Sequence, residues 1–178
     1  GCRGGGRRVP ARRGADVNER ESAVGARRGE IGDAFNADFG HPSRHETAIT
    51  EVVGVVEGIK YLRRNLRTFM CPTRRHVALH MRFGRARVEY QPLGVVGVMS
   101  PWNYPVNLSV MPVVTAIAAG NRGRLKPSEF TPANKAVLET MQGEHLREEQ
   151  GEVVNGDTTG GGAVREVRIA PDDPPADP

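Results

Sequence analysis

QPLGVVGVMSPWNYPVNLSVMPVVTAIAAGNRGRLKPSEFTP, residues 91–132, is the stretch that decides the fold. Residues 93–99 form an almost unbroken apolar run, which is typical of a strand buried on both faces of a parallel sheet. Residues 106–119 are apolar enough for a short buried helix, and Gly120-Asn121 supplies its stop. Residues 122–125 are predicted to form a second strand. This order of elements predicts a βαβ unit.

The residues on either side of this unit predict helices. Thr131 is a typical N-cap and Pro132 suits the first helical position, so a helix is predicted from there to about residue 146. Upstream, apolar residues at spacings of three and four predict one long amphipathic helix, which Pro72 ends. These apolar residues are Ile49, Val52, Val53, Val56, Ile59, Leu62, Leu66 and Phe69. A helix over residues 17–37 is less clearly marked, because each glycine in it costs about 1 kcal/mol against alanine.

The rest of the chain holds one predicted strand and two tails. Residues 77–92 predict a strand with one solvated face, because charged and apolar side chains alternate there. The glycine- and arginine-rich residues 1–15 and the proline- and aspartate-rich residues 160–178 are expected to be disordered. The chain therefore has room for a single domain, over residues 16–159.

The composition, 38% hydrophobic and 26% charged, suits a globular protein. The longest apolar stretches fall short of the roughly 20 residues that a membrane span needs, so no membrane association is expected. The first residues lack the apolar core of a secretory signal, and Cys2 and Cys71 lack the spacing of a disulfide framework or a redox pair. We therefore expect a cytoplasmic protein.

The formal net charge of +4 raises the question of nucleic-acid binding. Much of the excess comes from arginines in residues 1–15, and a second basic cluster consists of Arg63, Arg64, Arg67, Arg74 and Arg75. No aromatic platform or recognition motif accompanies the cluster, so a solvated surface is favoured and no nucleic-acid partner is expected. A basic nucleic-acid binder is the competing interpretation, and it predicts salt-sensitive retention of DNA in a filter-binding assay.

A metal site is also weighed. His76 and His80 have the spacing that chelates a metal on a helix, and Cys71 is close by. In an extended segment, however, four residues span about 13 Å, which is too far for one zinc ion. No metal site is expected.

Residues 91–132 strongly resemble the aldehyde dehydrogenase superfamily, and within it the coniferyl aldehyde dehydrogenase group. The similar pieces are the strand GVVGVMS, the turn PWNYP, the helix end AIAAGN and the segment KPSEFTP. NADFGHPSRHET and RARVEYQPLG extend the resemblance over roughly residues 17–159. It implies an α/β fold with amino-terminal helices, an incomplete Rossmann-like βαβ unit and a strand from an oligomerisation element. Residues 16–159 would form a partial NAD(P)-binding domain, and the intact enzyme would be a homo-oligomer.

The resemblance also implies an activity. It points to an oxidoreductase that oxidises coniferyl or another aromatic aldehyde to the acid with NAD or NADP. In that family a cysteine thiolate attacks the aldehyde, an amide side chain and a backbone N–H hold the oxyanion, and hydride passes to the nicotinamide. Asn103 is similar to the catalytic amide donor. Taken alone, an asparagine between prolines favours a plain turn residue, and the surrounding similarity reverses that preference.

The KPSE segment is similar to the family's cofactor-binding element. Lys126 and Glu129, with Ser128 between them, are implied to reach the adenosine ribose and any 2′-phosphate, at a strand end where open α/β sheets bind ligands. The resemblance implies that the cofactor groove is lined by Met99, Ser100, Pro101 and Trp102. It also implies that Trp102 and Tyr104 flank the substrate path. Core packing for the two aromatic residues, and a solvated loop for KPSE, are the alternatives.

Several features of the family have no counterpart in these 178 residues. They are the nucleophilic cysteine, the glutamate of an ELGGK-like motif and an FTGST-like nicotinamide loop. We therefore expect the 178-residue chain by itself to produce no NAD(P)H from an aromatic aldehyde. The alternative function is a catalytically inactive fragment that binds nucleotide or associates with an intact homologue. Gly123 and Arg124 also depart from the family's apolar strand, where a buried unpaired arginine would be costly.

Overall fold

The computed structural model describes residues 8–40, 48–145 and 151–153, and it confirms the α/β class. The helices are α1 (Arg8–Ala26), α2 (Arg28–Phe39), α4 (Gly54–Phe69), α5 (Asn107–Ala118) and α6 (Pro132–His145), with the π-helical turn η1 (Ala48–Val53) directly before α4. A parallel sheet consists of β3 (Val95–Met99), β4 (Arg122–Lys126) and β5 (Gly151–Val153). An antiparallel arm consists of β1 (Thr73–Arg75), the 3-10 turn η2 (Leu79–Met81) and β2 (Ala86–Val88).

The predicted βαβ unit is confirmed. β3 and β4 pair in parallel, and α5 connects them. Asn121 fixes the start of the pair, because its Oδ1 accepts the backbone N–H groups of Leu93 (2.5 Å) and Gly94 (3.1 Å). Gly120 follows α5 with a φ of +92°, a conformation that favours glycine. A second unit was not predicted: α6 leads to β5, which pairs in parallel with β4.

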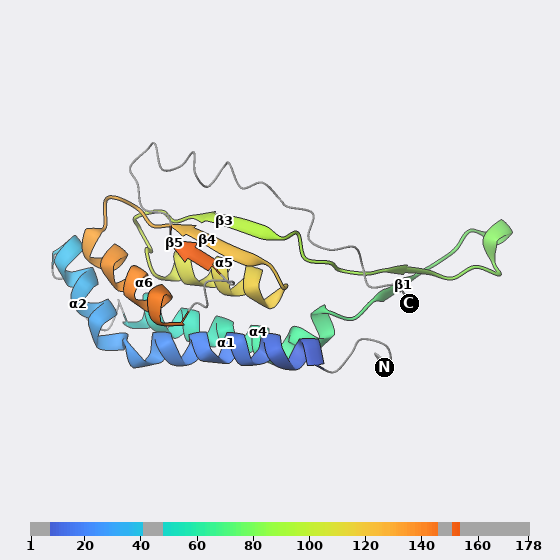
Figure 1. Ribbon diagram of the computed structural model, residues 1–178, viewed down its shortest axis with the longest axis horizontal. Helices are drawn as coiled ribbons and strands as arrows, with labels where there is room; N and C mark the ends of the chain where they lie inside the picture. Colours follow the sequence, from blue (N-terminus) through green and yellow to red (C-terminus); the bar gives the residue numbers. More distant parts are fainter. Residues whose placement is uncertain (1–7, 41–47, 146–150, 154–178) are drawn as a thin grey trace.

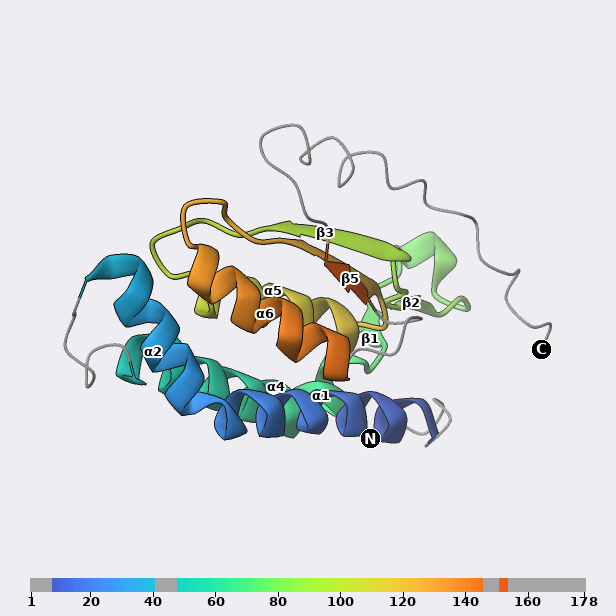
Figure 2. The ribbon, with the colours of Figure 1, turned by 60° about the vertical axis from the view of Figure 1, so that its left-hand side comes forward.

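Two clusters of buried side chains meet at α5, which explains its nearly continuous apolar sequence. Val113 and Ile117 pack toward the sheet with Val98 and Leu125. The larger cluster joins Val106, Val114 and Ala118 of this segment to Val17, Val24, Val55, Ile59 and Leu66 of α1 and α4. The molecule is therefore layered, with the sheet above α5 and α6, and with α1 and α4 below them (Figures 1 and 2).

The prediction that residues 93–99 are buried on both faces is wrong for the part of the chain that the structure describes. Within β3 only Val98 is buried, and Met99 is exposed. The reason is that the described helices all lie on the same side of the sheet (Figure 1). The apolar run indicates that the other face of β3 is also suited to being covered by a packed layer.

The amino-terminal helices begin earlier than predicted. Residues 8–15, which we expected in a disordered tail, form the first turns of α1. Arginine is a good helix former, and Val17 and Val24 are buried in the core beside α4. The less clearly marked helix over residues 17–37 is divided between α1 and α2. The expected tails at residues 1–7 and 160–178 lie outside the described residues.

The long helix predicted over residues 49–69 is present as η1 followed by α4, and it ends before Pro72. Val52, Ile59 and Leu66 of its predicted apolar face are buried, but Val53 and Phe69 are exposed. The two exceptions lie at the edges of the apolar face, where neighbouring elements do not cover them.

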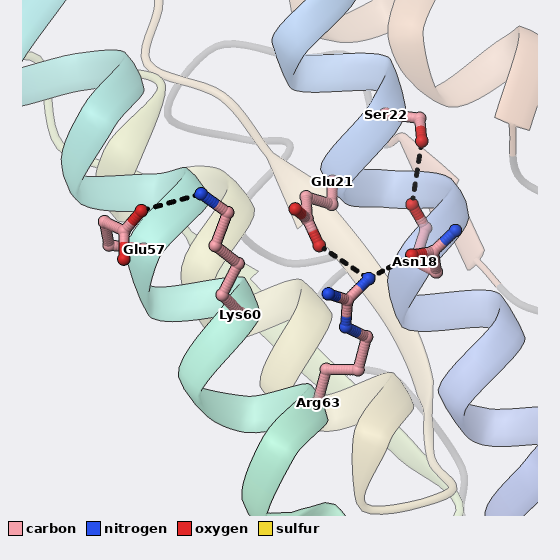
Figure 3. Close-up of polar contacts among 6 residues, drawn as sticks. All are labelled: Asn18, Glu21, Ser22, Glu57, Lys60 and Arg63. Carbon is pink, nitrogen blue, oxygen red and sulfur yellow. Dashed lines mark hydrogen bonds and ion pairs between the residues drawn. The ribbon is translucent and has the colours of Figure 1, made fainter.

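Arg63 of the basic cluster joins α4 to α1. Its Nη1 lies 3.1 Å from a carboxylate oxygen of Glu21 and also donates to the side-chain oxygen of Asn18 (Figure 3). One turn earlier, Lys60 pairs at 2.7 Å with Glu57 of its own helix. Arg63 is exposed, as expected for a solvated face, and its charge is also partly neutralised by Glu21 of α1.

The strand predicted over residues 77–92 is shorter than expected. Only β2 is formed there, and it pairs with β1 at the base of an arm that extends from the body (Figure 1). Both strands are exposed throughout, so none of the described elements covers either face of the arm. The large apolar side chains exposed on the arm and just after it are Leu79, Met81, Phe83, Val88, Tyr90 and Leu93.

Cys71, at the end of the segment that leads from α4 into the arm, is disulfide-bonded. This contradicts the expectation from cysteine spacing, because a disulfide depends on proximity in space, which sequence spacing does not give. None of the described helices is both long enough and apolar enough to cross a membrane.

The start of α6 is held by a residue from a distant helix. Pro132 is the first residue of α6, as predicted, but the hydroxyl of the expected cap, Thr131, is buried and forms no hydrogen bond among the described residues. Instead, the carboxylate of Asp38 in α2 accepts the backbone N–H groups of Ala133 (3.0 Å) and Asn134 (2.9 Å) and the side-chain amide of Asn134 (2.7 Å). Asp38 therefore caps α6 and docks α2 against it.

We expect Asp38→Ala to lower the free energy of unfolding by about 2 kcal/mol, because the first turn of α6 loses its cap. Urea denaturation followed by circular dichroism measures the change. Asp33→Ala, an exposed aspartate of the same helix, is the matched control and should shift stability by less than about 0.5 kcal/mol. Equal losses in the two variants would contradict the capping role.

Candidate active site at the carboxyl edge of the sheet

The predicted site residues follow two strands that end side by side. Met99 at the end of β3 is in register with Lys126 at the end of β4. The pairing continues one residue further, because the backbone N–H of Ser100 donates to the carbonyl oxygen of Lys126 at 3.0 Å. The turn that carries Asn103 and the segment that carries Glu129 therefore leave the sheet from the same edge, where open α/β sheets bind ligands.

The turn over residues 101–105 presents its polar and aromatic side chains outward. Trp102, Asn103 and Tyr104 are all exposed, and the exposed fraction of Trp102 is 56%. The Trp102 ring lies 6.5 Å from that of Phe39 at the end of α2, measured between centroids. Core packing, the alternative for Trp102 and Tyr104, is therefore not seen among the described residues.

Two serines hold the end of this turn. The hydroxyls of Ser100 and Ser109 lie 2.7 Å apart. Both hydroxyls also contact the carbonyl oxygen of Pro105, that of Ser100 at 3.3 Å. Ser109 is fully buried, so this polar group closes the turn from beneath.

Glu51 holds the other side of the same peptide bond. Its Oε2 accepts the backbone N–H of Val106 at 3.0 Å and that of Asn107 at 2.8 Å, at the start of α5. The side chain is fully buried. Burial raises the pKa of the Glu51 carboxyl above its ordinary 4.5, and the two backbone donors oppose that rise.

The raised pKa of Glu51 has a consequence for stability. A carboxyl whose pKa is higher in the folded chain binds its proton more tightly there, so its contribution is fully present below the unfolded-state pKa and is lost as pH rises through the folded value. Glu51→Gln has no proton to lose. We expect the stability of this variant, relative to the wild type, to increase as pH is raised from about 4 to 8 in urea titrations.

Glu57→Gln is the matched control for this pH series, because Lys60 lowers the pKa of the exposed Glu57 carboxyl. Glu57 contributes stability above its unfolded-state pKa, so the stability of Glu57→Gln relative to the wild type should decrease as pH rises. A flat difference between Glu51→Gln and the wild type would refute the prediction.

The KPSE segment places opposite charges next to each other. Lys126 Nζ pairs with Glu129 Oε2 at 3.0 Å, and the lysine side chain is largely buried while the glutamate is about one-third exposed, at 37%. Ser128 is buried, and its hydroxyl accepts the backbone N–H of Phe130 at 3.3 Å. A solvated loop, the alternative for KPSE, is therefore wrong for Lys126 and Ser128.

The two departures from an apolar strand are explained locally. A Cβ on Gly123 would lie 3.1 Å from Val113 Cγ1, so glycine suits the close packing of α5 on β4. Arg124 is half-buried and takes part in a polar interaction. The buried unpaired arginine that the sequence suggested is therefore absent at this position. Among the described residues, no group of three or more histidine, cysteine or acidic side chains is placed to hold a metal ion.

Sequence reasoning missed three residues that build this edge: Glu51, Ser109 and Asp38. Each acts on a backbone group, and for Glu51 and Asp38 that group lies in a remote segment, 55 or more positions away. A polar residue inside a predicted apolar helix face was the available signal for Glu51, because burial of a carboxyl requires partners.

A parallel sheet with crossover helices and a polar carboxyl edge defines the Rossmann-like class of α/β proteins. The chain belongs to the aldehyde dehydrogenase family, whose model matches residues 6–166. It is 44% identical over 124 residues to a probable coniferyl aldehyde dehydrogenase of Caulobacter vibrioides, covering 68% of this chain and 26% of the relative. It is 42% identical over 127 residues to a coniferyl aldehyde dehydrogenase of a Pseudomonas species, covering 71% of this chain and 26% of the relative.

Solved structures show the same fold. The substrate-bound AldH of Staphylococcus aureus superposes with a TM-score of 0.82 at 26% identity, covering 86% of this chain and 33% of that one. An AldC mutant of Pseudomonas syringae, complexed with NAD+ and octanal, superposes with a TM-score of 0.71 at 24% identity, covering 86% of this chain and 30% of that one. The chain thus spans about a quarter of the length of the curated relatives it matches, 26% in both cases given above.

Proposed function

We propose that this chain supplies the adenosine-ribose subsite and the oxyanion amide of an enzyme that oxidises an aldehyde to the acid with NAD or NADP. The observation that carries the proposal is the common edge, where Met99 pairs with Lys126 and the Asn103 turn follows directly. The relatives named coniferyl aldehyde dehydrogenase support coniferyl or another aromatic aldehyde as the substrate. We propose a cytoplasmic location on the same similarity.

The residues at this edge fit a dinucleotide. An ammonium group and a carboxylate 3.0 Å apart offer donors and acceptors to a ribose diol. Met99, Pro101 and Trp102 are exposed and Ser100 is half-buried, which leaves room for the cofactor beside β3. The bound nicotinamide would accept hydride. Asn103 would donate its side-chain N–H to the developing oxyanion, and exposed Trp102 and Tyr104 would flank the aldehyde.

We expect Lys126→Met to weaken NAD or NADP binding about ten- to a hundredfold, because a charge-assisted hydrogen bond to the ribose is lost. Isothermal titration of the purified chain with each dinucleotide measures this. Lys135→Met is the matched control, because Lys135 also pairs with a glutamate, at 3.7 Å, but belongs to α6 and not to the KPSE segment. Absence of binding by the wild type, or equal loss in the control, would contradict the proposal.

We also propose that the arm contacts a second copy of the chain in the intact enzyme. The support is the group of large apolar side chains that the arm leaves exposed, together with two strands that have no buried face. Solvent-exposed apolar patches of this kind mark interaction surfaces.

A further inference from the structure

The start of α5 depends on a remote side chain for its hydrogen bonds. The first N–H groups of any helix have no partner within the helix. Val106, the N-cap residue of α5, forms no side-chain cap. Glu51 Oε2 accepts the N–H groups of Val106 and Asn107 in its place, from a position 55 residues earlier.

The peptide bond between Pro105 and Val106 is therefore held on both sides. The hydroxyls of Ser100 and Ser109 contact its carbonyl oxygen, and Glu51 accepts its N–H. This peptide closes the turn two residues after Asn103. With Ser100 also bonded to β4, the turn is fixed at its beginning and at its end.

Packing alone does not require a carboxyl at position 51. The side chain is fully buried, and burial of a carboxyl costs free energy that an apolar side chain of similar size would avoid. Its second oxygen, Oε1, is also buried and forms no hydrogen bond among the described residues. The two backbone hydrogen bonds offset part of this desolvation cost, and they fix the position of the turn.

We propose that Glu51 is a positioning residue, which clamps the Pro105–Val106 peptide and thereby fixes the turn that presents Asn103. The effect of this clamp on catalysis rests on the proposed function of Asn103. The fixing of the turn by Glu51 does not depend on that function. Glu51 touches neither substrate nor cofactor in this proposal, and it acts through the backbone of α5.

Trp102, the single tryptophan of the chain, reports directly on this turn. The test compares the full wild-type chain with Glu51→Met and Glu51→Gln, using acrylamide quenching of Trp102 and amide hydrogen exchange of Val106 and Asn107. We expect Glu51→Met to fold, to exchange both amides about tenfold faster or more, and to show stronger quenching. Glu51→Gln keeps an acceptor oxygen and should restore wild-type values in both measurements.

Glu57→Gln controls for loss of an acidic side chain from the neighbouring helix. The inference would be overturned by wild-type exchange and quenching in a folded Glu51→Met chain, or by the same changes in the Glu57 variant. Neither readout involves nucleotide or aldehyde. A failure here is therefore distinct from a failure of the dinucleotide titration, which tests the proposed function.

Discussion

Replacing Asn103 by alanine should lower kcat by about 10²–10³ in an enzyme that carries this edge, because one oxyanion donor is lost. The measurement uses a chimera in which residues 91–132 replace the corresponding stretch of the Pseudomonas coniferyl aldehyde dehydrogenase. Asn103 lies on an exposed turn that directly follows β3, so its removal leaves the buried core unchanged. The KM for the dinucleotide should stay near that of the unmodified chimera, because the amide serves the reacting carbon and not the ribose.

Leu108→Ala in the same chimera is the control, since Leu108 is an exposed residue a few positions further along. Its kcat should stay within a factor of about two of the parent chimera. An Asn103→Ala enzyme with a kcat within a factor of about three of the parent would remove Asn103 from the catalytic machinery.

Leu125→Ala should lower the free energy of unfolding of the chain by about 3 kcal/mol, within the range of about 2–5 for buried leucines. Leu125 is 0% exposed and packs with Val98, Val113 and Ile117 between the sheet and α5. Truncation removes buried methyl groups and leaves a cavity that the paired strands cannot easily close. Urea denaturation followed by far-ultraviolet circular dichroism measures the loss.

The matched substitution is again at Leu108, which is 39% exposed on α5. Leu108→Ala should change stability by less than about 0.5 kcal/mol. If both leucine variants lost the same amount, the sheet–α5 interface would not be the stabilising core that the structure describes.

Local patterns predicted the elements that carry the site. The periodicity of residues 49–69, the stop at Gly120 and the order strand, helix, strand are all encoded within short windows, and the structure confirms each of them. The predicted βαβ topology also accounts for the common edge of Asn103 and Lys126, because parallel strands joined by a crossover end at the same edge. β5 was missed because three residues are too few to show a pattern.

Contacts between remote segments could not be predicted from the sequence. The caps supplied by Asp38 and Glu51 depend on which helix ends meet in space, so the nearer candidate, Thr131, was chosen wrongly. The burial of β3 was overestimated for a related reason. An apolar run shows that a face of a strand is suited to burial, but it does not show whether a neighbouring element covers that face.

The carboxylate of Asp38 reaches a helix 95 positions further along the chain, and this separation constrains the order of folding. During synthesis α2 leaves the ribosome long before its partner exists. The cap on α6 then forms only by closure of a very long loop. Such closure costs conformational entropy, and contacts between residues far apart in sequence form slowly. The first turn of α6 should therefore become stably structured late in folding, after the earlier helices have packed together.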